Sequence, residues 1–152
     1  MDFKPYVELL AALLTPTIGV TTAWIAIQQY RLAKERMRRD LYDRRIAVYR
    51  GVVEVLSAIM TFGRVRGEEL ATWARVTAEK SFLFDEGLCD YLESIRKQAV
   101  AMWAVGIQLH EGNLPVGEKR AELAGKQGDL LLWLSEQLPE VQKRFAKYLR
   151  VA

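Results

Sequence analysis

The side chains that could do acid–base or metal chemistry are few in this chain. His110 is the only histidine and Cys89 the only cysteine. A metal site of the usual kind needs several histidines or cysteines at close range, so none is indicated. We expect His110, beside Glu111 in a loop, to be a surface residue rather than a catalytic base. We expect Cys89, among apolar residues, to fill a small space in the core rather than to react as a thiol.

Two pairs of adjacent carboxylates, Glu68 with Glu69 and Asp85 with Glu86, are the next candidates for acid–base work. Adjacent side chains on a helix diverge, and acidic residues near helix starts commonly complement the helix dipole. Asp85 fits the N-cap of a following helix. The sequence contains no Gly-rich phosphate loop followed by Lys-Ser/Thr, no G-x-S-x-G and no dinucleotide fingerprint. We therefore expect a protein that is not an enzyme and has no cofactor and no metal ion.

Basic residues are concentrated in one segment of the 152-residue chain, whose formal net charge is +3. Residues 31–50 hold eight Lys and Arg against three acids, whereas residues 51–152 hold thirteen against fourteen. The whole basic excess therefore lies in about twenty residues. With 51% hydrophobic residues, the rest of the chain is able to form a sizeable core.

An uncharged run from Leu9 to Ile27 precedes this basic segment. As a helix it would extend roughly 29 Å, close to the ~30 Å of a hydrocarbon core. Trp24 and Tyr30 lie near its basic end, where amphipathic rings favour the headgroup layer. We expect residues 1–8 to be a short extracytoplasmic N-terminus and 9–30 a transmembrane helix. A buried core helix and a cleaved signal peptide are the alternatives, and both fit the length and flanks less well.

The orientation of this span follows from the basic residues immediately after it. The positive-inside rule puts them in the cytoplasm, so the sequence predicts a single-pass protein of the bacterial inner membrane with its N-terminus outside and residues 31–152 inside. The same side chains would rest on the anionic lipid surface of the bilayer. Binding of nucleic acid to this segment is the alternative that we weigh lower. The residues are Arg31, Lys34, Arg36, Arg38, Arg39, Arg44 and Arg45.

A stripe of small residues follows one face of the expected span, at spacings of three and four. Such stripes let helix backbones approach closely in lipid. With one span per chain, the stripe predicts contact with a second copy, and hence a homo-oligomer. Ordinary tolerance of small residues in lipid is the alternative. The residues are Ala12, Thr15, Gly19, Thr22 and Ala26.

The remaining pattern is helical throughout and predicts an all-α fold: the N-terminal transmembrane helix runs into an antiparallel cytoplasmic helical bundle at 31–152. Gly63 and Gly67 bracket an expected turn, and residues 110–117 form an expected loop. Pro139 is expected to open a last helix. The apolar positions expected to face the core are Tyr42, Ile46, Tyr49, Val53, Leu56 and Met60, flanked by Leu41, Val48, Val52 and Ile59 to give one broad face, then Leu70, Trp73 and Val76 of a helix over about 68–80, then Leu88, Leu92, Ile95, Ala99, Met102, Gly106 and Leu109, then Leu123, Leu130, Leu131 and Leu134, then Val141, Phe145, Tyr148 and Leu149.

Three stretches carry a resemblance to known proteins: WIAIQQYRLAKERMRRDLYDRRIAVYRGV, FLFDEGLCDYLESI and FAKYLRV. With them the chain resembles a broad group of small bacterial membrane proteins with one N-terminal span and a helical cytoplasmic part. More remotely, it is similar to the membrane accessory proteins of RNA-targeting CRISPR systems, whose helical domain is related to the HEPN nucleases. That similarity implies a membrane pore and a role in antiviral defence. The HEPN Arg-x4-6-His pair is absent, since no arginine precedes His110 at that spacing, so ribonuclease activity is not implied.

These features lead to one expected function and two alternatives. The first is a membrane-anchored, self-associating protein that acts as a pore-like or scaffolding effector in bacterial defence. The second is an adaptor that holds a partner protein at the cytoplasmic face of the membrane. The third is a membrane-tethered nuclease or nucleotide-sensing effector.

Overall fold

The computed structural model describes the backbone of residues 4–110 and 116–150, and the side chains from Ile18 onward within those ranges. All regular structure in the described residues is helical, which confirms the predicted all-α class. The helices are α1 (Lys4–Phe62), α2 (Gly67–Val76), the four-residue α3 (Lys80–Leu83), α4 (Glu86–His110) and α5 (Glu118–Leu149). The chain divides into two compact units, Met1–Asp40 and Leu41–Ala152, and α1 contributes to both.

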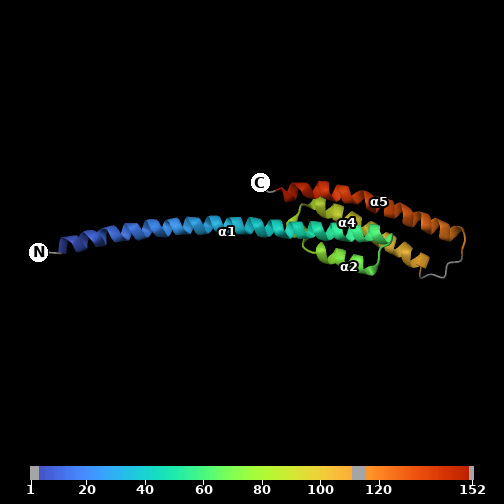
Figure 1. Cartoon of the computed structure of the whole chain (residues 1–152), viewed down its shortest axis with the longest axis horizontal. Helices are drawn as coiled ribbons and strands as arrows, with labels where there is room; N and C mark the ends of the chain where they lie inside the picture. The colour runs from blue at the N-terminus through green and yellow to red at the C-terminus, as the bar shows by residue number, and fades with distance from the viewer. Residues whose placement is uncertain (1–3, 111–115, 151–152) are drawn as a thin grey trace. The chain divides into compact units, whose positions relative to one another are not determined.

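The second unit, here called the bundle, is built from the part of α1 that begins at Leu41 together with α2 to α5. Within it, α1 and α4 run in one direction while α2 and α5 run in the other (Figure 1). The short turn over residues 63–66 imposes the reversal between α1 and α2, because a helix that follows a tight turn must return beside its predecessor. Gly63 adopts a φ of 63° in the turn after α1, where a residue without Cβ is favoured. The turn expected at GRVRG is therefore confirmed.

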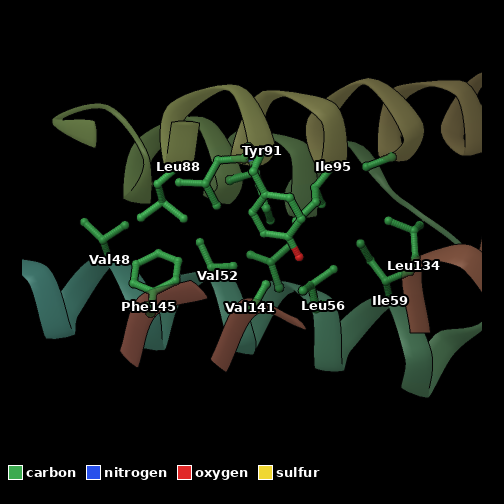
Figure 2. Packing of buried hydrophobic residues seen from close by; sticks show 14 of the residues in the cluster. Val48, Val52, Leu56, Ile59, Leu88, Tyr91, Ile95, Leu134, Val141 and Phe145 are labelled. Carbon is green, nitrogen blue, oxygen red and sulfur yellow. The ribbon is translucent and has the colours of Figure 1, made fainter. Parts of the chain in front are cut away.

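The core of the bundle lies where α1, α4 and α5 face one another (Figure 2). Val52 and Leu56 from α1, Leu92 and Ile95 from α4, and Phe145 from α5 are fully or almost fully excluded from solvent. In α4 the predicted stripe is confirmed from Leu88 to Leu109, except that Gly106 is only half-buried. These contacts supply the hydrophobic free energy that holds the helices together.

The predicted broad apolar face of α1 is confirmed in part. Its members Val48, Val52, Leu56 and Ile59 are buried, together with Val55, whereas its members Tyr42, Ile46, Tyr49, Val53 and Met60 are only half-buried and Leu41 is exposed. Two adjacent apolar rows run along this helix. The row that α4 and α5 cover is the buried one.

Three predicted boundaries are wrong. The helix expected over about 68–80 ends at Val76, with Thr77 as its C-cap; the next N–H, that of Ala78, bonds the Arg75 carbonyl oxygen (3.4 Å), three residues back instead of four. His110 is the last residue of α4 and not part of a loop. Residues 111–115 of that expected loop lie outside the described residues.

The third wrong boundary concerns Pro139, which lies inside α5 instead of opening a new helix. Leu134 before it and Val141 and Phe145 after it are all fully buried in one core. A straight continuation keeps these side chains in contact with α1 and α4, which offsets the hydrogen bond that the proline removes. In the first half of α5, Leu123, Leu130 and Leu131 are half-buried and not fully buried as predicted.

A close approach of α1 and α2 at Gly51 gives a testable consequence. A Cβ at this position would lie 2.6 Å from Val76 Cγ1 and 2.8 Å from Val76 Cβ. Because valine cannot rotate away, we expect Gly51→Ala to destabilise the bundle by about 1–3 kcal/mol in thermal unfolding of the full chain. Gly128→Ala on α5, where a Cβ meets nothing within 4 Å, is the control. It should stabilise by up to ~1 kcal/mol through helix propensity. Stabilisation by both changes would contradict the close packing.

Candidate functional site

The main candidate is the described part of α1 in the first unit, Ile18–Asp40, here called the exposed segment. Every one of its side chains is exposed. They include large apolar groups, for example Ile18 at 56%, Val20 at 70% and Trp24 at 64% exposure. Side chains of this kind are normally buried in a stable fold, and contiguous exposed apolar surface marks contact with a partner or a membrane.

The polar groups at the start of the exposed segment are satisfied within the helix itself. Thr21 Oγ1 donates to the Ile18 carbonyl oxygen at 3.0 Å, and Thr22 Oγ1 donates to the same oxygen at 2.7 Å. Internal bonding of this kind removes the desolvation cost of hydroxyl groups in a medium without water. The exposed segment is thus compatible with an apolar environment at Thr21 and Thr22.

The predicted stripe of small residues falls partly within this segment. Gly19, Thr22 and Ala26 are exposed residues of α1, and a Cβ at Gly19 would meet nothing within 4 Å. The side chains of Ala12 and Thr15 lie outside the described residues. The described part of the stripe therefore touches nothing that would block a second helix.

The predicted basic set divides between the two units. Arg31, Lys34, Arg36, Arg38 and Arg39 are exposed in the exposed segment. In the bundle, Arg44 pairs with Glu79 at 3.5 Å, and Arg45 donates from Nε to the Leu83 carbonyl oxygen at 3.1 Å. Arg45 also lies over the Tyr148 ring, 5.5 Å from its centre. The role of Arg45 includes the packing of α1 against α5.

Over the described residues, no helix is long and apolar enough to cross a membrane. The side chains of Leu9–Thr17, the first part of the expected span, lie outside the described residues.

Two of the carboxylates considered for acid–base work, Glu69 and Asp85, are engaged in structural contacts. Glu69 is buried, accepts a bond from Arg66 Nε at 2.9 Å and also caps the start of α2. Asp85 caps α4, as predicted, by accepting the Leu88 N–H at 3.0 Å. Burial raises the pKa of the Cys89 thiol, which disfavours the reactive thiolate. Among the described residues no group of three or more His, Cys, Asp or Glu is placed to hold a metal ion.

His110 lines a hollow of about 150 Å³ together with Arg64, Arg66 and Trp103. The spacing along the sequence did not predict an arginine beside His110, because Arg64 and Arg66 come from the turn between α1 and α2. The Arg66 guanidinium already binds Glu69 and stacks on Phe62, 4.4 Å from the ring centre. In this hollow, Arg66 is therefore held by structural contacts and lies beside the exposed His110.

A larger cavity, which sequence reasoning missed, lies between the start of α4 and the end of α5. Its volume is about 380 Å³, and we call it the α4–α5 cavity. The signal present in the sequence was the spacing of Lys143, Arg144 and Lys147, which puts three cations on neighbouring turns of one helix. Its lining residues are Asp85, Gly87, Leu88, Glu140, Lys143, Arg144 and Lys147.

A charged cluster near α3 makes the bundle sensitive to acid. Hydrogen bonds from Arg96 (Nη2 to Oε1, 2.6 Å) and Lys80 (Nζ to Oε2, 3.2 Å) lower the pKa of Glu93 from an ordinary value near 4.5 to about 2. The ionised form is favoured by folding, so this stabilisation is complete above pH ~4.5 and is lost as the pH falls toward ~2.

Replacement of this carboxylate tests the assignment. We expect Glu93→Gln to remove up to about 1 kcal/mol near neutral pH, the range of exposed ion pairs, and to flatten the acid side of the stability profile. Thermal unfolding midpoints of the full chain measured from pH 6 to pH 2 on the two proteins give the comparison. Exposed Glu136→Gln is the control. A profile for Glu93→Gln that is parallel to that of the parent would refute the role of this pair.

Comparison with known proteins adds no relative: no family model matches the chain, and neither the curated proteins nor the solved structures give a match.

Proposed function

We propose that the protein is a non-enzymatic, membrane-anchored helical protein that self-associates. Residues 9–30 form its transmembrane helix, and the bundle lies in the cytoplasm of a bacterial cell. The observation that carries this proposal is the exposure of every side chain from Ile18 to Asp40, large apolar groups included. Transfer of one such side chain from water to an apolar medium contributes about 1.5–3 kcal/mol. No described part of the chain covers these side chains, and the hydrocarbon core of a bilayer would do so.

The change from apolar to basic residues along the exposed segment supports a membrane over a soluble partner. Uncharged and mostly apolar side chains occupy its first half, while Arg31, Lys34, Arg36, Arg38 and Arg39 outnumber the two acids, Glu35 and Asp40, in its second half. A bilayer presents the same succession of hydrocarbon and anionic headgroup. The positive-inside rule then places the bundle in the cytoplasm and the N-terminus outside.

Self-association is proposed from the stripe of small residues, which has room for a neighbouring helix at Gly19. The assembly would act as a pore or as a scaffold, and a role in antiviral defence follows only from the resemblance to CRISPR accessory proteins. Particle mass in mild detergent tests assembly, and dye release from liposomes tests the pore. An oligomer that releases dye supports the pore, and one that does not supports the scaffold. A monomer would overturn self-association and leave an adaptor that holds a partner at the membrane.

The stripe itself is tested by adding bulk to it. We expect Gly19→Leu with Thr22→Leu to shift the protein to smaller species in mild detergent, because overpacking costs about 1–3 kcal/mol per site. No atom outside the local helix lies within 4 Å of a Cβ at Gly19, so a loss of mass would report contact between chains. Insertion should persist, since both changes increase hydrophobicity.

Val20→Leu, on a different face of the helix, is the matched control and should leave the mass unchanged. An unchanged particle mass in the double variant, or an equal loss of mass in Val20→Leu, would indicate that the chains associate through the bundle and not through the stripe.

A further inference from the structure

The α4–α5 cavity is bordered by three cations and two carboxylates. Lys143, Arg144 and Lys147 project from α5, while Asp85 lies at the start of α4 and Glu140 one turn before Arg144. The local side-chain charge is therefore one unit positive. The positive end of the 25-residue helix α4 adds to it.

The two carboxylates are held by contacts that turn them toward their own partners. Asp85 Oδ1 accepts the Leu88 N–H at 3.0 Å, and Oδ2 accepts from Lys147 Nζ at 2.7 Å. Glu140 Oε1 accepts from Arg144 Nε at 2.7 Å. These pairs engage Lys147 and the Nε of Arg144, so the positive excess lies on Lys143, and the contact between Glu140 and Arg144 leaves the two Nη groups to face a ligand.

Lys143 is the least constrained of the three cations. Its nearest carboxylate oxygen, Glu140 Oε2, is 3.9 Å away, and its side chain is 82% exposed. Arg144 lies over the Tyr91 ring, 4.1 Å from its centre, which holds its guanidinium at the cavity wall. An ammonium group that can reorient, beside a guanidinium held in place, is suited to binding a phosphate group.

Gly87 keeps the remaining wall open. A Cβ at this position would have only Asp85 Oδ1 within 4 Å, at 3.7 Å, so the first turn of α4 leaves room for a ligand beside its backbone. The Leu88 N–H is occupied by Asp85, but the N–H groups of Glu86 and Gly87 in the same first turn have no partner inside the helix and are suited to anions. The volume of about 380 Å³ is within the range of small-molecule sites.

We propose that the α4–α5 cavity binds a phosphate group, with Lys143 and Arg144 as its cationic contacts and the start of α4 as its backbone contact. This site lies in the bundle and does not depend on the proposed anchor. The phosphate comes from a soluble phosphate ester or from the headgroup of an anionic phospholipid, and the experiment below separates these sources.

The test is thermal unfolding of the full chain in phosphatidylcholine nanodiscs, titrated with glycerol 3-phosphate at constant ionic strength. Ligand that binds only the folded state raises the unfolding midpoint saturably. We expect such a rise with glycerol 3-phosphate and none with chloride. Lys143→Gln should weaken the apparent affinity about tenfold, the effect of one lost charge-assisted hydrogen bond. Lys126→Gln, an exposed cation elsewhere on α5, should change nothing.

A second variant blocks the cavity without disturbing the helix. Gly87→Glu puts a carboxylate into the open wall, where an acid also suits the helix dipole, so the bundle should fold and lose the response. No saturable rise in the parent, or a response kept in both Lys143→Gln and Gly87→Glu, would overturn the proposal.

The source of the phosphate is read from a parallel titration in nanodiscs that contain phosphatidylglycerol. If the lipid alone raises the midpoint in the parent but not in Gly87→Glu, and soluble ester adds nothing further, the lipid phosphate occupies the cavity. If only glycerol 3-phosphate acts, the ligand is soluble. If the chain does not enter nanodiscs at all, the anchor fails, and the same titration in detergent still tests the cavity.

Discussion

Replacement of Ile18 by arginine is expected to move most of the protein from the membrane fraction to the soluble fraction of the cell. Ile18 lies near the middle of the expected span and is 56% exposed. Arginine at a helix centre raises the free energy of insertion by about 2.5–3.5 kcal/mol, roughly a hundredfold in partition. The free energy that favours insertion of the parent span is small, because the span also contains a proline and four threonines: Pro16, Thr15, Thr17, Thr21 and Thr22.

The matched control for this prediction is Ile18→Leu, which keeps the apolar character and should remain in the membrane fraction. Both variants should keep the folded bundle, since Ile18 belongs to the other unit. If Ile18→Arg fractionates with the membrane as completely as the parent, Ile18 does not lie in the hydrocarbon region. A span limited to 9–30 would then be wrong.

Replacement of Phe145 by alanine is expected to cause the largest loss of bundle stability, about 3–5 kcal/mol. The side chain is fully buried, and its ring lies 5.5 Å from that of Tyr49 and 5.2 Å from that of Phe84. Truncation removes these contacts and leaves a cavity where α1, α4 and α5 meet. Domains are typically stable by about 5–15 kcal/mol, so the variant should be marginal at 37 °C.

Denaturant unfolding of the full chain in mild detergent measures this change, with tryptophan fluorescence as the signal, because Trp73 is buried in the bundle. Phe82→Ala is the control: Phe82 is 86% exposed, and its truncation should alter stability by less than about 0.5 kcal/mol. Equal effects of the two changes would place Phe145 outside the core. Membrane insertion of Phe145→Ala should persist, because the proposed anchor, residues 9–30, lies outside the bundle.

The helical class and the α4 stripe could be predicted because periodicity reports directly which residues share a face. The part of the broad α1 face that is fully buried could not. Tyr49, Val53, Val52 and Leu56 all belong to the predicted face, and only the covering helices decide that Val52 and Leu56 are buried while Tyr49 and Val53 lie at the edge. Pro139 was misassigned for a related reason. A local rule ends helices at proline, whereas burial of Val141 and Phe145 on the core of Leu134 favours continuation.

The α4–α5 cavity shows a further limit of sequence reasoning. The spacing of Lys143 and Lys147 indicates that they share a face of α5, but not that Asp85 and Gly87 from the start of α4 lie opposite them. Asp85 was predicted as a cap, and its second contact, with Lys147 at 2.7 Å, depends on how α4 and α5 pack. Local roles of residues were therefore accessible from sequence, and sites made by two distant segments were not.

The most direct test of membrane anchoring is the behaviour of the unaltered chain in membranes washed with alkaline carbonate at high salt. This treatment releases proteins held by charge, such as one attached only through Arg31, Lys34 and Arg36, because salt screens exposed charges. A helix inserted through residues 9–30 is held by hydrophobic burial and resists both salt and alkali. We predict that the protein stays in the membrane pellet until detergent is added. Its release into the carbonate wash would contradict anchoring through residues 9–30.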